Sequence, residues 1–100
     1  MLLCDVYFKD MPKSTTFGHP YGITIRGGTK IGEGCTFASN VTIGQRGKED
    51  SNTIIGNNVY FGTMAIVIGK VSIGNNVIIG AGAIVLKDVS DNTTVVGVYK

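Results

Sequence analysis

The 100-residue sequence contains no tryptophan, two prolines, one histidine and two cysteines, and only 16% of its residues are charged. The net charge is +2 without a run of basic residues, so the composition does not indicate a nucleic-acid partner. So few charges on so small a chain predict that part of its surface is covered by association with other copies.

The apolar runs are too short to cross a bilayer. The apolar residues 1–4 are followed by Asp5 and Lys9, which is unlike a signal peptide. Cys4 and Cys35 have neither disulfide nor metal-site spacing, and Cys35 falls at an apolar position where it acts as a small buried hydrophobe. Two unpaired thiols fit a reducing compartment, so we expect a cytoplasmic location.

Glycine is abundant, at 15 residues, and much of it belongs to a six-residue repeat. A large apolar residue recurs at every sixth position, at Ile25, Ile31, Phe37, Ile43, Ile55, Phe61, Val67, Ile73, Ile79 and Val85. A smaller or β-branched residue follows four positions later, at Thr29, Cys35, Val41, Val59, Ala65, Val71, Val77, Ala83 and Val89. A six-residue period is typical of a parallel β-helix, here with between three and four coils of three repeats each.

Four residues spaced 18 apart support three repeats per coil: Gly22, Asn40, Asn58 and Asn76. All four tolerate the left-handed backbone conformation that a tight corner needs. We therefore expect them to stack in one corner column. A β-sandwich with Gly and Asn turns is the alternative, but its turns would not keep this period.

Three segments depart from the repeat. Residues 1–16 are predicted to form an irregular N-terminal cap on the solenoid of residues 17–98, and residues 99–100 a tail. Glu49 falls at an inward position, where an unpaired carboxylate in a narrow apolar core would be very costly. We therefore predict an extruded loop at residues 44–54. Such a loop often carries function, and a solvated turn without function is the alternative.

His19 is the sole histidine, and Pro20 restricts its backbone to extended forms. A histidine side chain can exchange a proton near neutral pH, so His19 is a candidate general base. A surface histidine beside a turn is the alternative. The small residues 80–83 would let a ligand approach the backbone closely, or would allow tight packing between coils.

About four fifths of the chain resembles the hexapeptide-repeat acyltransferases. Within them it resembles the serine acetyltransferase branch, including relatives that acetylate sugars of bacterial capsular polysaccharide. The matching segments are HPYGITI at 19–25, NVTIG and the following loop at 40–54, the repeats at 55–89, and TTVVGV at 93–98. The resemblance implies an all-β, left-handed parallel β-helix, although parallel crossovers are usually right-handed. It also implies a homotrimer with active sites between subunits.

The resemblance further implies transfer of an acetyl group from acetyl-CoA to a small acceptor hydroxyl, without a metal. His19 matches the general base, and the acceptor oxygen attacks the thioester directly. Backbone N–H groups near the loop are expected to stabilise the oxyanion. The residues matching the coenzyme site are Gly44, Gln45, Arg46, Gly62, Thr63, Gly80, Ala81 and Lys87. The residues expected near the acceptor are Gly18, Tyr21, Ser51 and Asn52.

Several departures from the serine acetyltransferases bear on the acceptor. Gly18 replaces an acidic residue, and Ser51 and Asn52 replace a basic residue and a second histidine. No segment matches the α-helical domain whose carboxylate orients the base, so Glu49 or Asp50 is a candidate substitute. These neutral surroundings favour a sugar hydroxyl, as in polysaccharide biosynthesis, over L-serine.

Three other classes were weighed. A β-helical carbonic anhydrase needs three zinc-binding histidines per site, which this chain could supply only if three copies gathered them. An ice-binding solenoid needs a flat threonine face, whereas the outward positions here include Thr42, Ile78 and Tyr60. A non-catalytic assembly partner would form trimers without turning over acetyl-CoA.

Overall fold

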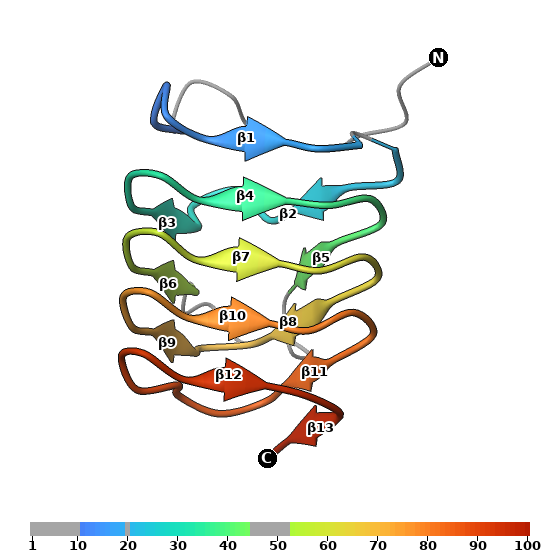
Figure 1. Cartoon of the computed structure of the whole chain (residues 1–100), viewed down its shortest axis with the longest axis vertical. Coiled ribbons are helices and arrows are strands. Elements are labelled where there is room, and N and C mark those ends of the chain that lie inside the picture. The colour runs from blue at the N-terminus through green and yellow to red at the C-terminus, as the bar shows by residue number, and fades with distance from the viewer. Residues whose placement is uncertain (1–10, 20, 45–52) are drawn as a thin grey trace.

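The computed structural model describes residues 11–19, 21–44 and 53–100, which form a stack of short parallel strands (Figure 1). In chain order these are β1 (Thr16–Phe17), β2 (Thr24–Ile25), β3 (Lys30–Ile31), β4 (Thr36–Phe37), β5 (Thr42–Gly44), β6 (Ile54–Ile55), β7 (Tyr60–Phe61), β8 (Ile66–Ile68), β9 (Ser72–Ile73), β10 (Ile78–Ile79), β11 (Ile84–Val85), β12 (Thr94–Val95) and β13 (Val98–Tyr99). Most of the predicted cap, residues 1–10, lies outside this description.

Successive strands belong to three different sheets, so the chain winds as a helix of strands. The first sheet has the order β1-β4-β7-β10-β12, the second β2-β5-β8-β11-β13 and the third β3-β6-β9. In Figure 1 the chain runs to the right along the first sheet, returns behind it and steps down by one row, which is a left-handed turn. The predicted left-handed parallel β-helix is therefore confirmed.

Three edges separate the sheets and position everything that follows. We call the edge between the first and second sheets the first corner, the edge between the second and third the second corner, and the edge between the third and first the third corner. The first corner lies at the right of Figure 1 and the third at the left.

The core is the column of inward side chains that the repeat predicts. The large inward residues are buried except Ile31, which lies in the uppermost strand of the third sheet and is half-buried. Phe37 stacks on Phe61 with ring centres 4.6 Å apart and on Phe17 at 5.6 Å. Because the strands repeat in register, like side chains meet in successive rows and fill the interior.

The coils differ in length, and this difference corrects one prediction. The first-sheet partners Phe17, Phe37, Phe61, Ile79 and Val95 are separated by 20, 24, 18 and 16 residues. The 24-residue coil has one repeat more than the regular 18, and the additional residues lie between β5 and β6. Residues 45–52 of the predicted loop are outside the described part of the chain.

The predicted single column of Gly22, Asn40, Asn58 and Asn76 is wrong, although each has a positive φ, between 57° and 64°. The Asn40 N–H donates to Tyr21 O at the first corner, whereas the Asn76 N–H donates to Asn57 O at the third. The long coil moves the register by one repeat between Asn40 and Asn58. The first-corner column is instead Gly22, Asn40, Met64 and Gly82.

Candidate functional site

His19 lies at the first corner of the top row, between β1 and β2. The partners of β1 are 20 residues away and those of β2 only 18. The top corner thus has two residues more than the corner below it, and His19 sits within this longer turn. The Gly18 N–H donates to Phe37 O at 2.9 Å, and the Tyr21 N–H donates to His19 O at 2.8 Å. These bonds hold the backbone around His19 while its side chain is exposed.

The rows beneath His19 carry other predicted site residues on the same corner. The Met64 N–H donates to Ser39 O at 3.0 Å, and the Gly82 N–H donates to Thr63 O at 2.8 Å. Thr63 and Ala81 therefore lie one above the other, and both are exposed. Since hydrogen-bonded rows are about 4.8 Å apart, His19 stands about 10 Å above Thr63 along the solenoid axis. The corner brings together residues that are 62 positions apart, from His19 to Ala81.

Two of the predicted coenzyme residues have a packing role. A Cβ added to Gly62 would lie 2.6 Å from the Ala81 backbone nitrogen, and one on Gly80 would lie 3.0 Å from Val95 O. These distances are too short for any residue other than glycine to fit without movement. At these two positions the tight coil packing weighed for residues 80–83 applies, and it places Thr63 and Ala81 close together.

The remaining described coenzyme residues, Gly44 and Lys87, lie at the second corner rather than near His19. Gly44 ends β5, and its carbonyl oxygen accepts the Gly69 N–H at 3.0 Å. Lys87 follows β11, with its ammonium group 4.8 Å from the centre of the Tyr99 ring. The second sheet thus separates the predicted coenzyme residues into two groups. Gln45, Arg46, Ser51 and Asn52 lie outside the described residues, as do Glu49 and Asp50.

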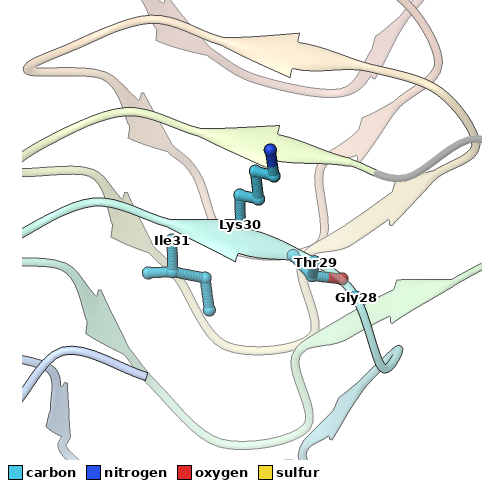
Figure 2. A pocket seen from close by; sticks show the side chains of 4 residues that line it. All are labelled: Gly28, Thr29, Lys30 and Ile31. Atoms are coloured by element: carbon cyan, nitrogen blue, oxygen red, sulfur yellow. The ribbon is translucent and has the colours of Figure 1, made fainter. Parts of the chain in front are cut away.

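A cavity of about 360 Å³ also lies by the second corner, lined by Gly28, Thr29, Lys30 and Ile31 (Figure 2). Lys30 and Ile31 project from opposite sides of β3. The Thr29 hydroxyl donates to Arg26 O at 2.6 Å, so it is already satisfied. The cavity contains none of the predicted site residues and no cluster of polar groups suited to the reaction.

The ionisable groups of the described segments are dispersed. Within residues 11–19, 21–44 and 53–100, no three His, Cys, Asp or Glu side chains gather as metal ligands do. The Cys35 thiol donates to Gly56 O at 3.2 Å, and burial raises its pKa, which keeps it protonated. No helix in this part of the chain is long and apolar enough to span a membrane.

The sequence analysis missed Met64, which follows Thr63 on the first corner. Its φ is +64° and its side chain is 60% exposed. The repeat could have revealed it, because Met64 occupies the position that Gly22, Asn40 and Gly82 occupy in other rows. The 18-residue count hid this relationship, since Met64 is 24 residues after Asn40.

The coil geometry and the first-corner site define a class: the left-handed β-helices built from hexapeptide repeats. Residues 52–87 match the bacterial transferase hexapeptide family, described by six repeats. The chain belongs to the hexapeptide-repeat transferases, and its structural neighbours are serine acetyltransferases. No match to a curated protein sequence was found.

Three solved structures represent these neighbours. The serine acetyltransferase of Neisseria gonorrhoeae in complex with serine is 32% identical, with a TM-score of 0.79 over 84% of this chain and 35% of that one. The soybean apoenzyme is 34% identical, with a TM-score of 0.76 over 80% and 34%. Isoform 3 from Entamoeba histolytica in complex with cysteine is 29% identical, with a TM-score of 0.76 over 83% and 32%. The chain therefore spans about a third of the length of these enzymes.

Proposed function

We propose that this protein transfers an acetyl group from acetyl-CoA to a hydroxyl of a small acceptor, with His19 as the general base. The observation that supports this most directly is the first corner. It carries an exposed histidine on a lengthened turn above the exposed Thr63 and Ala81, on a scaffold whose structural neighbours are acetyltransferases.

In the proposed reaction, an imidazole nitrogen of His19 accepts the proton of the acceptor hydroxyl. The oxygen forms a bond to the thioester carbonyl carbon, and the carbon–sulfur bond breaks. The proton then passes from His19 to the departing sulfur, so atoms and charges balance. Thr63 and Ala81 would bind the coenzyme arm below the reacting carbonyl, with Gly62 and Gly80 keeping their rows close.

The oxyanion donors in this proposal do not come from the first corner. The N–H groups of Asn40, Met64 and Gly82 already donate to carbonyl oxygens of the row above. The N–H groups of residues 44–46, at the root of the predicted loop, are the proposed donors. Gln45, Arg46 and Lys87 would also contact the coenzyme from the second corner.

We favour a sugar hydroxyl as the acceptor. Gly18 adds no charge beside His19, and Tyr21 presents a side chain that is 53% exposed on the same turn. An exposed aromatic ring with a hydroxyl suits a ligand that has both apolar and polar faces, as a sugar does. Ser51 and Asn52 would complete this side, and L-serine is the second candidate acceptor.

The proposal includes a homotrimer with sites between neighbouring subunits and a cytoplasmic location. Tyr60 and Ile78 are adjacent on the outer face of the first sheet, and both are exposed. Burial of such an apolar pair against another copy would favour association.

The test is release of free thiol from acetyl-CoA by wild type and by His19→Ala, with L-serine and with free and nucleotide-linked sugars. We expect turnover with a sugar and a loss of about 10²- to 10⁴-fold in the variant. Turnover that survives the substitution would overturn His19 as the base. A folded trimer without turnover on any acceptor would instead support the non-catalytic assembly partner.

A further inference from the structure

Met64 has a backbone conformation that methionine rarely adopts. Its φ of +64° lies in the left-handed region, where five described residues other than glycine are found, and the other four are asparagines. Asparagine tolerates this region, whereas a longer side chain is strained in it. The Met64 N–H donates to Ser39 O, a bond that glycine or asparagine would make equally well. The backbone therefore does not explain the methionine.

The core does not explain it either. The side chain is 60% exposed, so it contributes little buried apolar area to the fold. Below it, a Cβ added to Gly82 would meet no atom within 4 Å, and this side of Met64 is therefore open. A strained backbone held in an exposed position is more often found where a residue serves binding than where it serves stability.

The position of Met64 indicates what it contacts. It directly follows Thr63 and lies one row above Ala81 and Gly82, within the group proposed above to bind the coenzyme. Methionine is flexible and polarisable, and it adapts to narrow apolar ligands. The open space beneath it is at a corner rather than on a flat sheet face, which favours a thin chain over a broad protein surface.

We propose that Met64 is a specificity-determining residue that packs against the apolar arm connecting the thioester to the nucleotide of acetyl-CoA. This inference rests on the proposed function and adds a donor-binding residue to it. Met64 selects for the donor at a cost in stability, and the two effects are separable by substitution.

The experiment labels the three methionine methyl groups of the full chain with ¹³C and titrates the protein with acetyl-CoA. We expect the Met64 methyl resonance, assigned with Met64→Asn, to shift while the other two remain in place. Calorimetry should show that Met64→Asn weakens acetyl-CoA binding about tenfold, the effect of losing one apolar contact. Met64→Leu should recover most of this loss. The melting temperature of Met64→Asn without ligand should rise by a few degrees, because the strain is relieved.

Asn76→Gly is the matched control, since it changes a left-handed residue at the third corner and should leave acetyl-CoA affinity unchanged. Wild type that binds acetyl-CoA without a shift of the Met64 methyl would overturn the inference. So would a Met64→Asn protein with full affinity but a lower melting temperature and a smaller oligomer, because Met64 would then contact a second copy. Wild type that neither binds nor turns over acetyl-CoA would overturn the proposed function, and this inference with it.

Discussion

The ammonium group of Lys87 lies over the ring of Tyr99, 4.8 Å from its centre. This contact joins the end of β11 to β13, which also pair through their backbones, with the Leu86 N–H donating to Tyr99 O at 2.9 Å. Tyr99 is half-buried and packs against the core, although the sequence predicted residues 99–100 as a tail. Lys87 therefore helps to hold the last strand in place.

The first prediction concerns this pair. Tyr99→Ala should lower the free energy of unfolding by about 1–3 kcal/mol, because it removes ring packing and the cation–π contact. Tyr99→Phe keeps both and should cost less than about 1 kcal/mol. A double-mutant cycle with Lys87→Met, followed by urea unfolding, should give a coupling of about 0.5–1 kcal/mol. A coupling of zero would show that Lys87 is free to act only toward a ligand.

A second prediction concerns the central ring of the aromatic stack. Phe37→Ala removes the side chain between Phe17 and Phe61 and should cost about 3–5 kcal/mol, because a cavity remains in a narrow core. Thr36→Ala, on the outward side of the same strand, should change stability by less than about 0.5 kcal/mol. Equal effects in thermal unfolding would contradict the inward assignment of Phe37.

A third prediction tests the close approach of two corner rows. Gly62→Ala places a Cβ 2.6 Å from the Ala81 nitrogen, so the rows must separate, at a cost of about 1–3 kcal/mol. Gly18→Ala is the control, because its Cβ would be 3.9 Å from Phe37 O, in ordinary contact. If acetyl-CoA affinity falls in Gly62→Ala while Gly18→Ala retains the wild-type melting temperature, row spacing matters to the coenzyme site. Equal melting temperatures for both variants would contradict the packing role.

The fourth prediction concerns the buried thiol. Burial raises the pKa of Cys35, so the folded protein holds this proton to a higher pH than the unfolded chain does. Its contribution to stability is therefore present below the pKa of a free thiol, about 8.5, and is lost as the pH rises above that value. In a Cys4→Ser background, a thiol reagent at pH 8 should label Cys35 only slowly until urea unfolds the protein. Rapid labelling of the folded protein would contradict this.

The six-residue period was sufficient to predict the fold and almost all the core. Alternation along each short strand decides which side chains face inward, and that pattern is local in sequence. His19, Thr63 and Ala81 could be named from the resemblance, but their common edge could not. It depends on the length of every coil between them, and the 24-residue coil breaks the simple count.

What the sequence determined by itself is therefore the class of structure: three short parallel sheets around a column of stacked apolar residues, with glycine and asparagine at the turns. The tertiary structure decided which turns stack together. It placed Asn58 at a different corner from Asn40, put His19 on a turn with two additional residues, and left Met64 strained and exposed beside Thr63. The physical reason is that corner alignment accumulates the lengths of all preceding coils, whereas inward or outward orientation depends only on neighbouring residues.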